Sequence, residues 1–261
     1  MQIRTKIFEK RKDLMEGLSA YILPVDPRWR KRLIPPESEK LQELQMYLEM
    51  QKENPKIPES YLKFACYVAK GDGGILDDGE EFRFIMPSKI TEHINNNDEL
   101  DNGLACIYDL ITGLMCYIDL ENDGKISKEG DFYISSSFEK YLFQRAVQKF
   151  EERYFPVYLG FEYKEWFSFD QKRALDIVLN EFIQRNQMQT VWFNDEYFFF
   201  AYNQEYSFWI TQLEYYCHKG EVGVTGIFYG NDIDKIQREL LPQIGAEASW
   251  IRDGDQLKRL N

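Results

Sequence analysis

Residues 119–127, DLENDGKIS, carry the side chains whose types and spacing come nearest to a metal site. Asp119, Glu121 and Asp123 alternate with other residues and are followed by Gly124, as at the start of a calcium-binding EF-hand loop. The twelfth position of that loop requires a bidentate glutamate, but this chain has Gly130 there. The preceding segment, LMCYIDL, alternates like a strand and not like an EF-hand helix. A β-turn is therefore preferred over a calcium site, and no metal is expected.

Other residues that could carry catalysis lack the partners that such chemistry needs. The stretch that begins at Gly71, Gly-Asp-Gly-Gly, is not followed by the Lys-Ser/Thr pair of a phosphate-binding loop. His93 and His218 belong to no recognisable nucleophile signature. Cys217 adjoins His218 in a predicted strand, where neighbouring side chains point to opposite faces and cannot form a dyad. We therefore expect no catalytic residue and no cofactor.

The cysteine pattern argues against a zinc site or a disulfide framework. The four cysteines are widely spaced, the chain has no Cys-x-x-Cys motif, and it contains two histidines. We expect the cysteines to act as small buried apolar residues. They are Cys66, Cys106, Cys116 and Cys217.

A run of carboxylates, Asp77, Asp78, Glu80 and Glu81, is the strongest candidate for binding a partner. It lies within residues 70–131, which carry fifteen acidic and five basic side chains in a chain of net charge -12. Such a surface repels nucleic acid and attracts a basic protein over a long range. Ordinary solubility charge is the alternative interpretation. A glycosidase pair is not assignable, because it is defined by a separation in space.

Two further clusters leave alternatives open. Residues 28–32 place four basic side chains around Trp29. These side chains could bind a phosphate, but the preferred interpretation is a surface strap, that is, a segment whose basic side chains pair with the acidic region of the same chain. The aromatic stripe in residues 190–229 could form a ligand platform, but core packing is preferred.

The stretch that organises the first part of the chain is residues 57–87. Pro58 suits the first turn of a helix, and Tyr61 begins an apolar face that continues to Val68. The glycines from Gly71 onward are expected to end this helix, because glycine adopts positive φ without strain. A strand that Pro87 closes is expected next.

The segments around it predict an antiparallel sheet with helices. A short helix is expected over residues 7–18 and another over residues 38–54. Strands are expected in residues 104–110 and 114–120, the second ending in an Asn-Asp-Gly turn. A serine N-cap then opens an amphipathic helix over residues 138–150.

Residues 36–150 as a whole resemble the SUKH superfamily, which includes bacterial immunity proteins and the yeast cell-wall-assembly regulator. The residues that carry the resemblance are Pro58, Tyr61, Gly73, Gly74, Gly113 and Phe138. The chain departs from the family pattern at Asp72, where many members carry asparagine, and residues 151–261 fall outside the resemblance. The resemblance implies an antiparallel sheet flanked by helices and a role in protein binding.

Residues 151–261 predict a second α+β unit. Ser168 is expected to cap a helix over residues 169–186, and aromatic strands and a last helix opened by Asp232 follow. We expect a ferredoxin-like plan with an extra hairpin. The predicted organisation is a basic extension (1–35), a SUKH-like domain (36–150) and a C-terminal domain of unassigned role (151–261).

The leading functional hypothesis is a non-enzymatic immunity protein that neutralises a cognate, basic bacterial toxin, such as a nuclease. A regulatory scaffold that docks several partners is the first alternative. Small-molecule binding or hydrolysis by the C-terminal region is the second. Since no apolar run is long enough for a bilayer or a signal peptide, we expect a cytoplasmic protein that does not bind membranes. Because the chain is acidic, we also expect that it does not bind nucleic acid.

Overall fold

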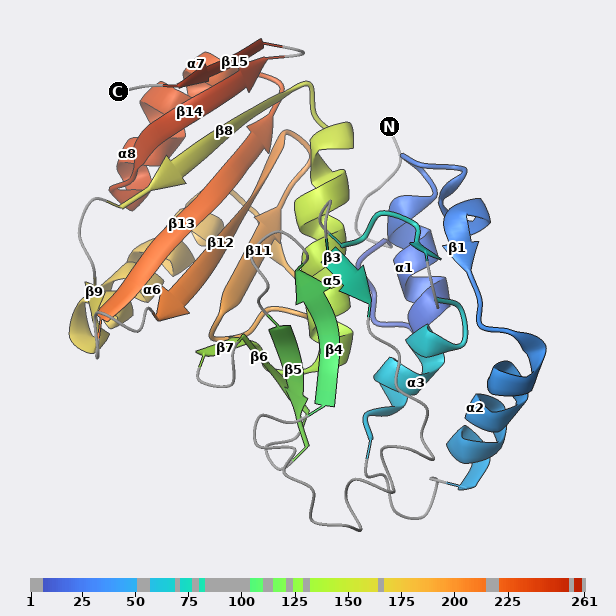
Figure 1. The fold of residues 1–261 in the computed structure, drawn as a ribbon. Coiled ribbons are helices and arrows are strands. Elements are labelled where there is room, and N and C mark those ends of the chain that lie inside the picture. The colour runs from blue at the N-terminus through green and yellow to red at the C-terminus, as the bar shows by residue number, and fades with distance from the viewer. Residues whose placement is uncertain are drawn as a thin grey trace. The chain divides into compact units, whose positions relative to one another are not determined.

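The structure is a computed structural model, and it describes eleven stretches of the chain. These are residues 7–50, 57–68, 71–76, 80–82, 104–109, 115–120, 124–128, 132–163, 167–214, 221–253 and 256–259. Two units are present: an N-terminal unit of residues 10–149, and a C-terminal unit of residues 1–9 with 150–261. Both combine helices with antiparallel strands, which confirms the predicted α+β class (Figure 1).

The helices of the N-terminal unit are set by local signals at their ends. They are α1 (Leu14–Ile22), the 3-10 turn η2 (Trp29–Arg32), α2 (Ser38–Met50), α3 (Glu59–Ala65) and α5 (Phe138–Phe150). The prediction for residues 7–18 is wrong in its bounds, because the side chain of Asp13 accepts a hydrogen bond from Glu16 N and caps a later helix. Helix α3 also ends before the glycines, at Ala65, and Gly71 lies in a strand.

Two antiparallel sheets belong to the N-terminal unit. A small one pairs β1 (Leu33–Ile34) with β2 (Gly71–Asp72). A five-stranded sheet has the order β3-β4-β5-β6-β7. Its strands are β3 (Glu80–Phe82), β4 (Leu104–Asp109), β5 (Met115–Asp119), β6 (Lys125–Lys128) and β7 (Phe132–Ser135). The sequence did not predict β7, which has four residues and pairs with β6 across a register shift.

The C-terminal unit is built on one eight-stranded sheet. Its strands are β8 (Val157–Glu162), β9 (Phe167–Ser168), β10 (Gln189–Thr190), β11 (Phe198–Tyr202), β12 (Tyr206–Glu214), β13 (Glu221–Gly230), β14 (Glu247–Asp253) and β15 (Gln256–Arg259). The sheet order is β10-β11-β12-β13-β8-β14-β15, and β9 pairs with β13. The helical segments are η4 (Glu151–Arg153), α6 (Phe169–Arg185), α7 (Ile233–Lys235), the π-helical η5 (Ile236–Leu240) and α8 (Leu241–Ile244).

The strand order of the C-terminal unit agrees with the predicted ferredoxin-like plan with an extra hairpin. In a β-α-β-β-α-β plan, the first strand lies between the strand before the second helix and the last strand, and all neighbouring strands are antiparallel. Here β8 lies between β13 and β14 and pairs antiparallel with both. Strands β10, β11, β12 and β13 follow α6 as an antiparallel meander, so one extra hairpin extends the pair of strands that the plan requires.

The core of the C-terminal unit lies between the sheet and its helices. Figure 1 shows α6, α7 and α8 on one face of the sheet. Phe182 of α6 packs there against Phe208 and Phe228, with ring centroids 5.7 and 6.0 Å apart, respectively. Phe8 packs against Tyr202 at 4.6 Å, which explains why the first residues belong to this unit.

Loss of the α6 cap should measurably destabilise the C-terminal unit. Ser168 accepts a hydrogen bond from Gln171 N, and the Gln171 side chain accepts one from Ser168 N, which completes a capping box. We expect Ser168→Ala to lower the free energy of unfolding by about 1 kcal/mol, measured by urea denaturation. Ser168→Asp should retain the stability, and an equal loss in both variants would contradict a capping role.

Candidate functional site

The glycine corner of the N-terminal unit is held by the side chain of Asp72. Gly73 and Gly74 have φ values of +72° and +85°. The two carboxylate oxygens of Asp72 accept hydrogen bonds from Gly74 N at 2.8 Å and Leu76 N at 2.7 Å. An aspartate at this position therefore fixes the corner through two backbone N–H groups.

Trp29 requires glycine at position 73. A Cβ built on Gly73 would lie 2.5 Å from Trp29 Nε1, whereas a Cβ on Gly74 would meet nothing within 4 Å. Trp29 is fully buried. The corner thus depends on a contact between η2 and a turn about forty residues later in the chain.

The basic cluster around Trp29 is engaged within its own unit. Arg32 forms two hydrogen bonds with the carboxylate of Asp26, at 3.0 and 2.6 Å, and donates to Gly73 O at 2.8 Å. The hydrogen bond to Asp26 raises the pKa of Arg32. Arg30 donates to Ser19 Oγ at 2.7 Å. These contacts favour the strap interpretation for Arg30 and Arg32.

The predicted partner-binding carboxylates are only partly placed. Asp77 and Asp78 lie outside the described residues. Glu80 and Glu81 belong to β3, the end strand of the five-stranded sheet, and pair with Asp109 and Tyr108 of β4. The acidic run therefore leads directly into a strand at the end of the sheet order.

The residues that carry the family resemblance have structural positions. Pro58 is the N-cap of α3, and a Cβ on Gly124 would lie 2.8 Å from its Cγ. Tyr61 and Phe138 are fully buried, and their ring centroids lie 5.4 Å apart. Gly113 lies outside the described residues.

The segment that imitates a calcium loop follows a strand, as predicted. Asp119 ends β5, its carboxylate accepts a hydrogen bond from Tyr133 Oη at 2.6 Å, and Gly124 has φ of +72°. Glu121 and Asp123 lie outside the described residues, as do His93, Cys217 and His218. Among the described residues, no group of three His, Cys, Asp or Glu side chains could hold a metal.

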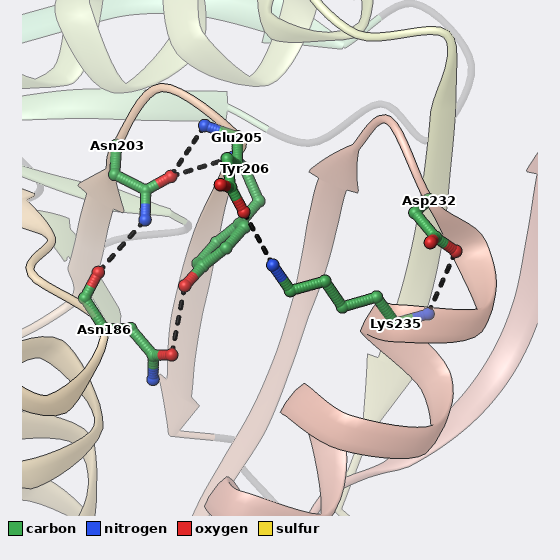
Figure 2. A network of polar contacts seen from close by, with 6 residues as sticks. All are labelled: Asn186, Asn203, Glu205, Tyr206, Asp232 and Lys235. Carbon is green, nitrogen blue, oxygen red and sulfur yellow. Dashed lines mark hydrogen bonds and ion pairs between the residues drawn. The ribbon is translucent and has the colours of Figure 1, made fainter.

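A polar network in the C-terminal unit joins the turn between β11 and β12 to the end of α6 and the start of α7 (Figure 2). The ammonium of Lys235 lies 2.6 Å from the carboxylate of Glu205 and 5.3 Å from the ring centre of Tyr206. The Tyr206 hydroxyl donates to Asn186 Oδ1 at 3.0 Å. Asn203 Oδ1 accepts from both Glu205 N and Tyr206 N at 2.9 Å. The network therefore combines a carboxylate, an ammonium and a fixed phenol.

A surface depression of about 310 Å³ lies beside this network. Ile236 and Leu240 are buried on its inner side, whereas Glu205 is 67% exposed. The hydrogen bond to Glu205 raises the pKa of Lys235, and burial raises the pKa of Tyr206. Both side chains therefore keep their protons at neutral pH. The depression can receive an apolar group with a polar or charged end.

Sequence reasoning found the parts of this network but not their association. The helix start at Asp232 is predicted from local residue types, and Asp232 does cap α7 by accepting a hydrogen bond from Lys235 N. The proximity of Lys235 to Glu205 depends on the pairing of Tyr206 with Gly230 between β12 and β13. No local sequence pattern predicts this register of β12 and β13.

The aromatic stripe of residues 190–229 forms core, as preferred from the sequence. Phe200, Phe208 and Phe228 are fully buried, and Phe208 lies 4.9 Å from Phe228 between ring centroids. Trp209 is half-buried, and its Nε1 donates to Tyr229 Oη at 3.0 Å. The described aromatic side chains therefore chiefly connect strands.

The two most different thiols of the N-terminal unit should react at different rates. Burial raises the pKa of Cys66, which is half-buried, and raises that of Cys106, which is fully buried, well above the usual value. Because the thiolate is the nucleophile, we expect iodoacetamide at about pH 8 to modify Cys66 at least about tenfold faster. Peptide mass spectrometry separates the two sites, and equal rates would contradict the buried position of β4.

Comparisons with known proteins assign no family to this chain. Comparisons of the chain with protein families, with curated proteins and with solved structures give no match. Among the described residues, no helix has both the length and the apolar character that crossing a membrane requires.

Proposed function

We propose that this protein is a non-enzymatic immunity protein that binds and neutralises a cognate basic toxin. The observation that carries the proposal is the order of elements in the N-terminal unit. Helix α3 is followed by a corner with two glycines at positive φ, an antiparallel sheet and α5, which begins at Phe138. This order supports the resemblance to the SUKH superfamily, whose bacterial members include immunity proteins.

The charge distribution supports a basic partner. Residues 70–131 carry fifteen acidic and five basic side chains, and part of this charge enters the end strand β3. A concentration of one sign accelerates encounter with a partner of the opposite sign. The partner-binding segment is then 77–81, with Asp77, Asp78, Glu80 and Glu81 as its charges.

Co-expression tests the function directly. The protein would be expressed with the toxin encoded beside it, and both cell survival and a purified complex would be scored. We expect protection together with a stable complex. The absence of both protection and a complex would overturn the proposal. A pull-down that returns many unrelated partners instead of one toxin would favour the regulatory scaffold.

Neutralising the acidic segment should slow toxin association. We expect the fourfold variant Asp77→Asn, Asp78→Asn, Glu80→Gln, Glu81→Gln to lower the association rate constant about tenfold at low salt, because long-range steering is lost. The difference should shrink as salt rises, since the Debye length is about 8 Å at physiological ionic strength. Stopped-flow fluorescence over a salt series measures both effects.

A matched variant of the C-terminal unit controls for net charge. It removes four carboxylates from exposed positions: Glu162→Gln, Glu181→Gln, Glu239→Gln and Asp253→Asn. Equal slowing in both variants would mean that total charge acts, and not the 77–81 segment. An unchanged rate in the first variant would place toxin recognition on another surface.

A second candidate function is small-molecule binding by the C-terminal unit, which the depression beside Tyr206 favours. Its ion pair and buried apolar side suit a small amphiphilic ligand. A thermal-shift screen of metabolites on the wild type and on Glu205→Gln separates this function from toxin binding. A ligand that stabilises only the wild type would support it, and the absence of any such ligand would remove it.

A further inference from the structure

A basic depression of about 560 Å³ is present on the N-terminal unit, where α1 and α3 begin. Four cationic side chains line it, in a chain whose net charge is -12. They are Lys10, Arg11, Lys12 and Lys63. A concentration of positive charge that runs against the charge of the whole chain calls for a specific explanation, and solubility does not supply one.

Arg11 and Lys12 are the uncompensated cations of this depression. In the part of the chain that the structure describes, neither side chain forms a hydrogen bond or an ion pair. Both immediately precede Asp13, which caps α1, and Leu14, which is 3% exposed. Their backbone is therefore anchored to the core, while their charged groups remain exposed to solvent.

The other two cations are each paired with a carboxylate that also lines the depression. Lys63 Nζ lies 2.8 Å from Glu59, and Lys10 Nζ lies 3.2 Å from Glu139. Among the residues that the structure describes, the lining therefore carries four positive and two negative charges, a balance of +2. Glu59 is 69% exposed and Lys10 is 57% exposed, so solvent screens these pairs and an incoming anion can compete for the cations.

We propose that this depression binds a small molecule that carries a di- or triphosphate group. A guanidinium donates two parallel hydrogen bonds to phosphate oxygens, which suits Arg11, and Lys12 adds a second charge beside it. Ser60, also in the lining, supplies a neutral hydroxyl donor. The two carboxylates oppose any anion, so only a ligand with several negative charges gains enough attraction to bind.

The shape of the depression fits this ligand class. A volume of about 560 Å³ falls within the range of small-molecule sites, roughly 300–1,000 Å³, and exceeds what a single phosphate ion fills. The proposal uses no residue of segment 77–81, so it stands or fails separately from toxin binding.

The test is isothermal titration calorimetry with sodium tripolyphosphate on the full chain at low salt. The double variant Arg11→Gln, Lys12→Gln should lose about tenfold or more in affinity, because it removes the two free cations. The matched control is Lys172→Gln, Arg173→Gln, which removes an adjacent pair of the same charge from α6. Its affinity should stay within about twofold of the wild type.

A further variant, Glu59→Gln, is expected to increase the affinity for tripolyphosphate instead of lowering it. Glu59→Gln releases Lys63 and removes a repulsive charge, so it should tighten tripolyphosphate binding about two- to fivefold. Pyrophosphate and citrate carry similar charges near neutral pH, and pyrophosphate should bind more tightly than citrate, whose charges lie on planar carboxylates. No binding of tripolyphosphate to the wild type, equal losses in both double variants, or equal affinities for pyrophosphate and citrate would each overturn the proposal. Circular dichroism of each variant verifies that it is folded.

Discussion

Replacing Gly73 with alanine should lower the free energy of unfolding of the N-terminal unit by about 2–5 kcal/mol. The left-handed conformation at φ of +72° costs about 1–2 kcal/mol for a residue with a Cβ. The new methyl group would also lie 2.5 Å from Nε1 of the buried Trp29, and such overpacking costs about 1–3 kcal/mol. Urea denaturation followed by circular dichroism measures the sum.

Gly74→Ala is the matched control, because it carries the same backbone strain without the clash. Its φ is +85°, and no atom lies within 4 Å of the added Cβ. We expect a loss of about 1–2 kcal/mol. Similar losses at the two positions would show that Trp29 yields to the methyl group, and the corner would then depend on backbone conformation alone.

A second large effect is expected in the core of the C-terminal unit. Phe228 is fully buried on β13, and its ring lies 5.5 Å from Phe161, 6.0 Å from Phe182 and 4.9 Å from Phe208 between centroids. It therefore contacts its neighbours within the sheet as well as helix α6. Truncation to alanine should cost about 3–5 kcal/mol, through lost burial and the cavity left behind.

Hydrogen exchange measured with Phe228→Ala shows where the loss acts. Protection should fall first in β8, β12 and β13, the strands on which these rings lie or to which β13 pairs. Ile177→Ala on α6 is the control, since Ile177 is 60% exposed and should change stability by no more than about 0.5 kcal/mol. A uniform loss of protection over residues 10–149 as well would contradict two units with separate cores.

Local residue patterns predict the elements whose causes lie within a few positions of one another. Helix α6 starts where Ser168 and Gln171 form a capping box, and α5 has the predicted bounds because its apolar spacing is helical. The hairpin between β5 and β6 follows from the Asn-Asp-Gly turn. Each of these signals acts over one turn of chain, so sequence alone suffices to read it.

The candidate functional sites, in contrast, depend on contacts between residues that are distant in the sequence. The acidic run 77–81 and the basic residues 10–12 are visible as charge, but only the fold places Arg11 beside Lys63 and ends a sheet at β3. The network of Lys235 with Glu205 likewise needs the β12–β13 register. Sequence indicated which side chains are charged, and tertiary structure decided which of them meet.

The sequence by itself therefore determined the α+β class, the principal helices and strands, and the glycine corner at Gly73 and Gly74. Only the tertiary structure decided that Trp29 packs on Gly73, that Tyr206 pairs with Gly230, and that four cations share one depression. The physical reason is the range of the forces. Capping, turn conformation and periodicity act between neighbours in sequence, whereas strand pairing and side-chain packing join distant residues whose register depends on the whole core.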